Sequence, residues 1–436
     1  MLQKHKEDKV KKFLVLFVLL GLALLCQANW LQFQGNSAHT GLSEDAVVVN
    51  SLLWQDSLAP LDFFSGPVTS DGTIFVPTLG GLYCLDVNTG DLLWCQPGEF
   101  SGVPAIIGGR IVAVQAETLR CFTLDGDLLW LLGFPTRPSH PTVANGIIYL
   151  TAGRKVYAVD SDGAPRWVSA ELRYGFNTNM TPCCYDSFVV VATRGGGTSL
   201  EPSTVVYVLS RGSGQVIKSA EYGWPEASNV TTPTVLGSRL YLAVLPGWFN
   251  ASFIYSVKLP GNTQAWDIEY DPRVIKTYYA SSAGTNDRVF FVGEGLQAYD
   301  TISGRRLWTA NVGRASYSSP LVSAGVIWLG NDAGELFGID AVSGLVRQRF
   351  QCGNAPLTSP ATTSDGKLII CDLSGRLYCF GYVVAVEEDP TQFWSPTQLR
   401  PGIYNAMGQR LREIPSRSGI YFHIDGSRSQ KVVILR

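Results

Sequence analysis

The sequence is poor in the residues on which nucleic-acid binding depends. Only 16% of its 436 residues are charged, and 34 Lys and Arg against 36 Asp and Glu leave a formal net charge of −2. A protein that neutralises a phosphate backbone needs an excess of basic side chains. The composition therefore argues against a nucleic-acid partner and is typical of a globular protein with a large apolar core.

Histidine is also scarce, which restricts metal binding and catalysis. His39, His140 and His423 are far apart and show neither the spacing of a zinc site nor a Ser/His/Asp pattern. Residues 195–197 (GGG) lack the Lys and the following helix of a phosphate-binding loop. Residues 160–163 (DSDG) lack the closing Glu of a calcium loop and are expected to form a turn. We therefore predict no catalytic residue, no metal site and no cofactor.

Long apolar runs are missing except near the N-terminus. Five lysines in the first twelve residues precede an apolar run at 13–25, which is short for a membrane span and is followed by small residues. This pattern predicts a secretory signal peptide at residues 1–28. We expect an exported mature chain without a membrane span, at the cell surface or secreted. The alternative is a periplasmic chain that is lipid-anchored at Cys26, although Leu25 is larger than lipoprotein processing normally takes.

Eight cysteines follow this leader, a number that is compatible with disulfides in an oxidising compartment. Cys84, Cys121 and Cys379 replace small residues of a strand that is expected to be buried, so we predict that they are buried thiols. Cys183 and Cys184 are adjacent in the sequence and form a possible vicinal disulfide.

What the chain does have is a repeat. A Ser/Thr-x-Pro-like step followed by two strand-like runs and a tight turn recurs eight times, at spacings of 37 to 51 residues. Its anchors are Pro67, Pro104, Pro141, Pro182, Pro233, Ser282, Pro320 and Pro360. Units of this length built from strands indicate propeller blades, because each is too small to bury its own apolar face and must stack on its neighbours.

The second half of each unit is a hairpin that ends in tryptophan. Residues 81–94 read GLYCLDVNTGDLLW, in which two strand-like runs flank a Gly-containing turn. A tryptophan follows the turn in four other units, at Trp130, Trp167, Trp266 and Trp308. We predict that a large aromatic repeated at one strand position packs between blades rather than binding a ligand.

The two ends of the repeat complement each other. Residues 50–54 (NSLLW) resemble the last strand of a unit but have no hairpin before them, whereas residues 375–380 (GRLYCF) resemble a third strand with no tryptophan strand after it. The N-terminal strand is therefore expected to complete the last blade, which removes open sheet edges. The predicted fold is all-β, an eight-bladed propeller of four-stranded blades over residues 29–383, followed by a small C-terminal β unit.

Residues 81–94 resemble the repeat of the PQQ-like (quinoprotein alcohol dehydrogenase-like) propeller family. Residues 30–41 (WLQFQGNSAHTG) are similar to the lead-in of its non-enzymatic members, and the resemblance covers about residues 30–383. The family includes alcohol dehydrogenases, an outer-membrane barrel-assembly lipoprotein and many binding propellers, so the resemblance implies the fold more than the function. Dehydrogenases of this family carry an adjacent-cysteine disulfide near the quinone, which Cys183 and Cys184 would match. The calcium-binding Glu and Asn and the Asp base of those enzymes do not align, so PQQ and Ca²⁺ are expected only under that alternative.

The C-terminal segment has a different character. Residues 384–401 are rich in proline and acidic residues and are interpreted as a linker. Residues 402–411 (GIYNAMGQRL), 418–422 (SGIYF) and 431–436 (KVVILR) resemble the C-terminal sorting domain of the Bacteroidetes-type type IX secretion system. The resemblance implies that residues 402–436 are recognised by type IX export machinery. The alternative is an extra hairpin docked on the propeller.

A binding face is predicted at one mouth of the channel. Aromatic residues precede many of the repeat anchors, arginines occur in the same segments, and the two longest repeats place extra loops at residues 194–203 and 246–252. Loops carried by a rigid scaffold often bind ligands. The candidate partner-binding residues are Phe64, Phe100, Arg137, Phe176, Trp224, Trp248, Tyr279, Arg314 and Tyr317. The same aromatics could instead pack between blades, and the sequence leaves both roles open.

These observations favour an exported, non-catalytic β-propeller that binds a protein, peptide or glycan through one channel face. Two alternatives remain. The first is a PQQ-dependent alcohol or sugar dehydrogenase. The second is an envelope assembly scaffold similar to the barrel-assembly lipoprotein.

Overall fold

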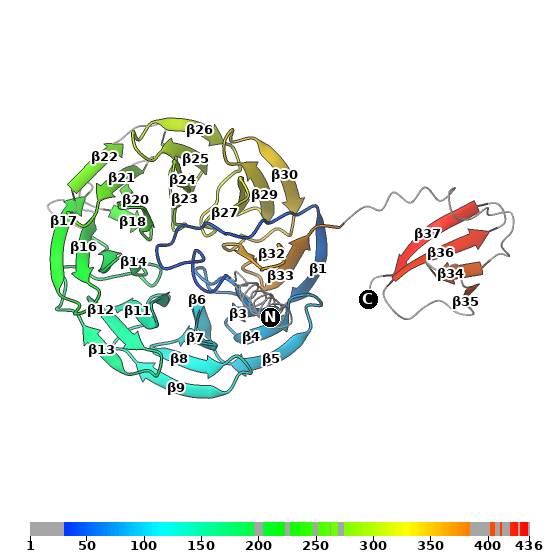
Figure 1. Cartoon of the computed structure of the whole chain (residues 1–436), viewed down its shortest axis with the longest axis horizontal. Coiled ribbons are helices and arrows are strands. Elements are labelled where there is room, and N and C mark those ends of the chain that lie inside the picture. Colours follow the sequence, from blue (N-terminus) through cyan, green and yellow to red (C-terminus); the bar gives the residue numbers. More distant parts are fainter. Residues whose placement is uncertain are drawn as a thin grey trace, which may run out of the picture. The chain divides into compact units, whose positions relative to one another are not determined.

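The computed structural model describes residues 30–195, 204–222, 227–246, 252–261, 263–268, 274–383, 402–405, 410–411, 419–425 and 428–434. Within these ranges all the regular secondary structure consists of β-strands. The chain divides into two compact units, Met1–Tyr382 and Val383–Arg436. The first unit is a ring of eight sheets, as Figure 1 shows, and it confirms the predicted eight-bladed propeller.

Each blade is an antiparallel sheet whose strands follow one another from the centre outward. Blade 1 contains β2 (Val68–Ser70), β3 (Thr73–Pro77), β4 (Gly81–Asp86) and β5 (Leu92–Pro97). Blade 2 contains β6 (Phe100–Ile107), β7 (Arg110–Gln115), β8 (Thr118–Thr123) and β9 (Leu128–Gly133). Blade 3 contains β10 (Thr142–Ala144), β11 (Ile147–Ala152), β12 (Lys155–Asp160) and β13 (Pro165–Val168). Blade 4 contains β14 (Cys183–Tyr185), β15 (Phe188–Ala192), β16 (Thr204–Ser210) and β17 (Val216–Tyr222).

The second half of the ring repeats this pattern, except that two short strands share the inner position of blade 5 and both pair with β20. Blade 5 contains β18 (Ala227–Val230), β19 (Thr234–Leu236), β20 (Arg239–Pro246), β21 (Phe253–Lys258) and β22 (Thr263–Ile268). Blade 6 contains β23 (Ala283–Gly284), β24 (Arg288–Gly293), β25 (Gly295–Asp300) and β26 (Arg306–Ala310). Blade 7 contains β27 (Leu321–Ser323), β28 (Val326–Gly330), β29 (Glu335–Asp340) and β30 (Val346–Gln351). Blade 8 contains β31 (Ala361–Thr362), β32 (Leu368–Cys371) and β33 (Arg376–Gly381).

The outer strand of blade 8 comes from the other end of the propeller sequence. Strand β1 (Ser51–Ser57) pairs antiparallel with β33, so that Trp54 lies opposite Cys379. The predicted closure by the N-terminal strand is therefore confirmed. It gives blade 8 the same four strands as its neighbours and leaves no blade incomplete at the seam.

Among the described side chains, tryptophans fasten five of the eight blades to the next blade at the outer edge of the propeller. The Trp94 indole N–H donates to the Leu124 carbonyl at 2.8 Å, and the ring covers Gly126, where a Cβ would lie 2.9 Å from it. Equivalent indole bonds join Trp54 to Val87, Trp130 to Ser161, Trp167 to Arg211 and Trp308 to Ala341. Gln348 replaces the tryptophan in blade 7 and its amide donates to the Val49 carbonyl. These contacts confirm the predicted packing role for Trp94, Trp130, Trp167 and Trp308, whereas the side chain of Trp266 lies outside what the structure describes.

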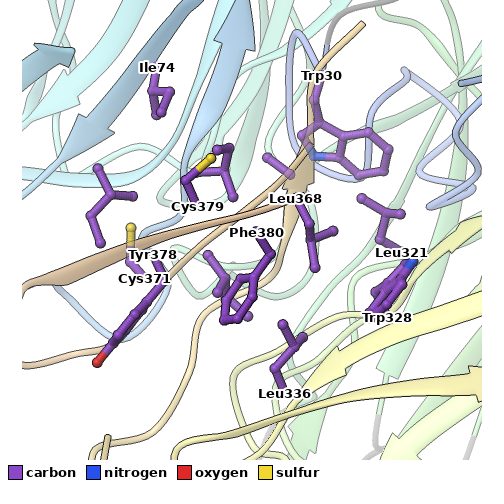
Figure 2. Close-up of a cluster of buried hydrophobic side chains, with 14 of the residues drawn as sticks. Trp30, Ile74, Leu321, Trp328, Leu336, Leu368, Cys371, Tyr378, Cys379 and Phe380 are labelled. Atoms are coloured by element: carbon purple, nitrogen blue, oxygen red, sulfur yellow. The ribbon is translucent and has the colours of Figure 1, made fainter. Parts of the chain in front are cut away.

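Apolar clusters fill the space between neighbouring blades. Figure 2 shows the cluster at the seam, where Trp30 and Trp328 pack near residues of β32 and β33. Cys84, Cys121 and Cys379 are buried free thiols in such clusters, as predicted. Stacked apolar faces of this kind are the main source of stability in a repeat ring.

The first part of the segment before β1, residues 30–41, lies inside the ring of inner strands, and the dark blue trace in Figure 1 then runs outward to β1. It accepts hydrogen bonds of 2.7 to 3.1 Å from backbone amides of seven successive blades. From blade 1 to blade 7 the pairs are Trp30–Thr69, Leu31–Ile106, Gln32–Val143, Ser37–Cys184, Ala38–Val235, Thr40–Gly284 and Gly41–Val322. Residues 30–41, called the lead-in from here on, therefore satisfy amides that a bare channel would leave unpaired.

The second unit contains one small antiparallel sheet. Its strands are β34 (Gly402–Asn405), β35 (Arg410–Leu411), β36 (Gly419–Asp425) and β37 (Arg428–Ile434), in the order β35-β34-β36-β37. Strands β36 and β37 form a hairpin in which Asp425 lies opposite Arg428. The propeller is thus followed by a small β unit, as the fold prediction stated.

Candidate functional site

A funnel opens where the connections between blades enter the inner strands. It encloses about 290 Å³, part of which is open to solvent at its mouth. The residues that line it are Phe33, Phe64, His140, Asn179, Thr232, Tyr279, Tyr317, Ser319 and Ser359. Phe33 belongs to the lead-in, and the other eight come from the connections that precede seven of the inner strands. The funnel is therefore assembled from nearly every blade.

The lead-in forms the floor of the funnel. The Phe33 ring lies 5.4 Å from the His39 ring and 5.5 Å from the His140 ring, edge-to-face in both cases. His39 holds the lead-in to two blades, since its Nδ1 lies 3.2 Å from the Pro233 carbonyl and its Nε2 lies 3.0 Å from Thr142 Oγ1. Burial lowers the pKa of His39 to about 4, although the contact with Pro233 raises it slightly, so the ring is neutral at physiological pH.

His140 lies in the wall of the funnel. Burial, with a smaller contribution from the nearby His39, lowers the pKa of its imidazole to about 3. Neither ring nitrogen of His140 has a hydrogen-bond partner among the residues that the structure describes. Gly102 makes room for the ring, because its φ is +78° and a Cβ there would lie 2.6 Å from His140 Cδ2.

Asn179 shows the same combination of burial and unused hydrogen-bonding groups. The residue is 4% exposed, and no described residue pairs with its carboxamide nitrogen or oxygen. Its backbone carbonyl, in contrast, accepts the hydroxyl of Thr232 and the backbone amide of Thr181. Buried side chains of this type are normally paired, so these atoms require an explanation.

Hydroxyl groups connect the remaining blades around the funnel. The backbone amide of Ser281 donates to Ser319 Oγ at 2.9 Å, and the amide of Ser319 donates to Ser359 Oγ at the same distance. Thr181 Oγ1 likewise donates to the carbonyl of His140 at 2.5 Å. The Ser/Thr positions of the repeat thus bind one blade to the next and hold the wall rigid.

Aromatic rings form the rim of the funnel. Tyr279 and Tyr317 stack with 5.9 Å between ring centroids, Phe63 stacks on Tyr317 at 5.2 Å, and Phe64 meets Tyr279 edge-to-face at 5.2 Å. Phe63 is 54% exposed and Tyr279 37% exposed. Burial raises the pKa of Tyr317, so its hydroxyl stays protonated at physiological pH. The rim therefore offers solvent-accessible aromatic surface above a wall that contains polar side chains.

The two predicted arginines at this end are already paired within the protein. The Arg314 guanidinium lies 4.2 Å above the Tyr278 ring and its Nε is 3.1 Å from the Asp332 carboxylate. Arg137 Nη1 lies 3.4 Å from the Asp62 carboxylate. Neither residue lines the funnel.

The structure separates the predicted site residues into three groups. It brings Phe64, Tyr279 and Tyr317 together at the funnel. It places Phe100, which is 1% exposed, between blades 1 and 2 against Phe122, and it packs Phe176 on the clusters either side of blade 4.

The third group cannot be placed. Trp224 and Trp248 lie outside the described residues, so their role in binding stays a prediction, as does that of the arginines. The two enlarged connections fall between the second and third strands of blades 4 and 5, and residues 196–203 and 247–251 within them also lie outside the described residues.

Six of the nine lining residues were missed from the sequence, and His140 and Asn179 are the two whose side chains are least expected there. His140 stands directly before a repeat proline, where Gly66, Thr232 and Ser319 hold the equivalent position in other blades. A large imidazole in a series of small residues was the signal that could have identified it. Asn179 has no such signal, because it lies three residues before its proline in a connection of irregular length.

The adjacent cysteines lie in different clusters. Cys183 packs between blades 4 and 5, whereas Cys184 packs between blades 3 and 4, and each is described as a free thiol. Neighbouring residues of a strand point to opposite faces, which explains this arrangement. Neither cysteine lines the funnel, and a disulfide between them stays a prediction.

The residues of the funnel do not suit a calcium-dependent quinone cofactor. Calcium takes carboxylate and carbonyl oxygens, and none of the nine lining residues carries a carboxylate. Among the described residues, no group of three or more His, Cys, Asp or Glu could hold a metal ion.

In the described part of the chain, no helix has the length and apolar character that a membrane span requires.

Comparison with known families identifies the repeat. A family model described as outer membrane protein assembly factor BamB matches residues 47–243 and 250–413, which include strands β1 to β33. The chain belongs to the BamB family. The match confirms the predicted PQQ-like propeller repeat, and it extends into the C-terminal unit without testing the sorting-domain interpretation.

Individual relatives agree with this assignment. The chain is 24% identical over 347 residues to the outer membrane protein assembly factor BamB of Moranella endobia (strain PCIT), covering 73% of this chain and 75% of the relative. BamB from Moraxella catarrhalis superposes with a TM-score of 0.58 at 14% identity, covering 76% of this chain and 97% of that one. A quinohemoprotein alcohol dehydrogenase from Comamonas testosteroni superposes with a TM-score of 0.66 at 12% identity, covering 82% of this chain and 81% of that one. Identities this low in the two structures support the fold alone.

Proposed function

We propose that this protein is a non-catalytic scaffold for the assembly of outer membrane proteins and that it acts by binding protein partners. The observation that carries the proposal is the BamB family match, which runs through the whole ring from β1 to β33. The related chain of Moranella endobia bears the same description. Of the functions that the sequence left open, the envelope scaffold is thus favoured over a secreted binding protein.

The funnel face is the surface that we propose for partner binding. Its aromatic rim is exposed at Phe63 and Tyr279, and large aromatics with few rotatable bonds are enriched at protein interfaces. The ring of hydroxyl contacts beneath holds the rim on rigid strands, so little conformational entropy is lost when a partner binds.

The proposed location is the periplasmic side of the outer membrane, with Cys26 as the acylated residue. A scaffold for outer membrane proteins must meet them before insertion, which a protein released to the cell surface does not do. The sorting-domain interpretation of residues 402–436 is the rival, because type IX export leads to the surface. Fractionation of cells that carry Cys26→Ser, or a chain ending at residue 383, separates these routes. Release of the Cys26→Ser chain from the membrane supports the anchor, whereas loss of surface exposure in the truncated chain supports export.

The function is tested by deleting the gene and restoring it. We expect lower levels of several outer membrane β-barrel proteins in the deletion strain and recovery with the intact chain. Photo-cross-linking from position 63 should capture an envelope assembly component that mass spectrometry identifies. Unchanged barrel-protein levels together with no cross-linked envelope protein would overturn the proposal. Dye-linked alcohol oxidation by the purified chain with PQQ and Ca²⁺ would overturn its non-catalytic part.

A further inference from the structure

The outer strand of blade 2 is a sheet edge without the usual protection against pairing. Strand β9 reads LLWLLG and contains neither a charged residue nor a proline. Each of the other seven outer strands contains at least one such residue: Asp56, Pro97, Arg166, Lys218, Asp267, Arg306 and Arg347. Charges and prolines are means by which proteins keep an edge strand from pairing with another chain. Strand β9 is therefore the outer strand that is open to pairing.

Exposed leucines lie along this edge. Leu128, Leu129 and Leu131 are 47%, 46% and 54% exposed, so all three side chains are accessible to a partner. A charged partner surface would lose hydration against them and would gain no opposite charge. The segment that covers the edge is therefore apolar.

The backbone of β9 offers hydrogen-bonding groups at the same edge. The strand is last in the order β6-β7-β8-β9, so among the described strands only β8 pairs with it. The Phe134 amide donates to the Glu117 carbonyl at 2.8 Å, at the end of the β8–β9 pair. Residues of an antiparallel pair alternate between facing the partner strand and facing away, so Leu132 faces β8 and Leu131 directs its N–H and C=O outward. A free edge of this kind binds an extended segment by strand addition.

The sequence of β9 is complementary to itself. Residues 128–132, Leu-Leu-Trp-Leu-Leu, read the same in both directions about Trp130. When two copies pair antiparallel about Trp130, every leucine of one strand lies opposite a leucine of the other, for example Leu129 opposite Leu131. A two-fold interface requires this property, because the same surface meets itself. The strand therefore fits a second copy of the same chain.

The outer strand of blade 7 shows what the same pairing does in a charged sequence. Strand β30 reads VRQRFQ, and antiparallel pairing about Gln348 places Arg347 of one copy opposite Arg349 of the other. Like charges directly opposite each other destabilise a strand pair. Blade 2 avoids this conflict, since Asp127, which directly precedes β9, lies opposite Gly133 in the symmetric arrangement.

We propose that β9 pairs antiparallel with β9 of a second copy of this chain, so that the two second blades form one continuous sheet. The pairing does not depend on the assembly function, and it uses the outer edge of the propeller rather than the funnel face. One strand pair is a small interface, so the dimer is weak. We expect a dissociation constant on the order of 0.1 mM and a monomer at low micromolar concentration.

Sedimentation equilibrium of the full mature chain tests the proposal, over concentrations from about 5 µM to about 500 µM that bracket this constant. We expect the mass to rise from that of the monomer towards that of the dimer. Leu131→Lys introduces a charge into the apolar strand pair and should weaken association at least tenfold. The matched control is Leu93→Lys on β5, which replaces a leucine of nearly equal exposure, 53% against 54%, outside the pair.

Both replaced leucines are exposed, so thermal melting should be unchanged in both variants. Equal association in the two variants overturns the proposal, because the contact then lies elsewhere. A wild-type chain that stays monomeric at every concentration overturns it without any variant.

The register is tested with single cysteines. Position 129 of one copy faces position 131 of the other in the symmetric pair, so a mixture of Leu129→Cys and Leu131→Cys chains should form a disulfide-linked dimer faster than either chain alone. The wild-type chain gives the background from its own cysteines. Equal rates in the mixture and in the separate chains overturn pairing about Trp130.

Photo-cross-linking from position 131 in cells identifies what covers the edge. We expect a product that contains two copies of this chain. A product with a different protein, and none with a second copy, would overturn the assignment and show that β9 receives a strand of that protein instead.

Discussion

The outer rim and the channel mouth both carry aromatic residues from blade to blade, but the fold uses them differently. At the rim, the Trp94 and Trp130 indoles donate to carbonyls of the next blade and cover its turn glycine. At the mouth, Phe63 and Tyr279 keep much of their surface exposed, and Asn179 beneath them has no partner among the described residues. Positions that repeat the same residue thus join the blades, whereas the mouth, where the residues differ from blade to blade, carries the groups that we propose for binding.

The largest expected effect comes from removing the seam of the ring. A chain without residues 30–57 loses β1 and the lead-in, which exposes the β33 edge and leaves inner-strand amides of seven blades unpaired. We expect aggregation and no cooperative unfolding transition. Size-exclusion chromatography and thermal melting measure both. A monomeric chain with an unchanged melting temperature would show that closure at the seam does not stabilise the ring.

A circular permutant separates the two losses. Joining residues 50–57 after residue 383 is feasible because the Asn50 amide already donates to the Gly381 carbonyl at 3.0 Å. This chain regains the outer strand of blade 8 but not the lead-in. We expect it to be soluble and monomeric, with a lower melting temperature than the intact chain.

The second largest effect concerns the tryptophans at the outer edge of the propeller. Trp94→Ala empties the space between blades 1 and 2, and we expect it to lower the free energy of unfolding by about 3 kcal/mol. Trp94→Phe keeps an aromatic ring but loses the hydrogen bond to Leu124, so we expect it to lower the free energy of unfolding by about 1 kcal/mol. Chemical denaturation measures both. If Trp94→Ala lowers the free energy of unfolding no more than Tyr279→Ala does, the proposed difference between the outer edge and the channel mouth is wrong.

The third effect concerns the lead-in and depends on pH. The pKa of His39 falls from 6.5 to about 4 on folding, so between these values the unfolded state binds more protons. Stability is therefore retained above pH 6.5 and lost as the pH falls towards 4, by about 1.4 kcal/mol per pH unit. His39→Gln should make this dependence shallower, whereas His423→Gln, in the other unit, should leave it unchanged for the propeller. If stability depends on pH with the same slope in the wild-type chain and in both variants, His39 is not held neutral by burial.

The ring could be predicted because its signals are local. A hairpin turn followed by a tryptophan is contained in fourteen residues at 81–94, and the half-blades at the two ends indicated the closing strand β1. The lead-in could not be placed, because its partners lie from about forty to nearly three hundred residues away and it carries no periodic pattern. The burial of His140 depends on Phe33 and was missed for the same reason.

The smallest effect on stability, and the largest expected on binding, belongs to the mouth. Phe63→Ala combined with Tyr279→Ala removes rings that are 54% and 37% exposed, so we expect less than about 1 kcal/mol of lost stability. Buried aromatic anchors often contribute 2 kcal/mol or more to an interface, and 1.4 kcal/mol is tenfold in affinity. Affinity for the cross-linked partner should therefore fall at least tenfold.

The matched control for this double variant lies on the outer edge of the propeller. Leu93→Ala with Leu129→Ala also removes two exposed apolar side chains, at 53% and 46% exposure, but from outer strands β5 and β9. Both double variants therefore lose similar apolar surface, and only the mouth pair should weaken partner binding. Equal losses of affinity in the two would show a general hydrophobic contact rather than recognition by the funnel face. If the mouth variant loses stability but still binds the partner, Phe63 and Tyr279 have a packing role, like the tryptophans at the outer edge.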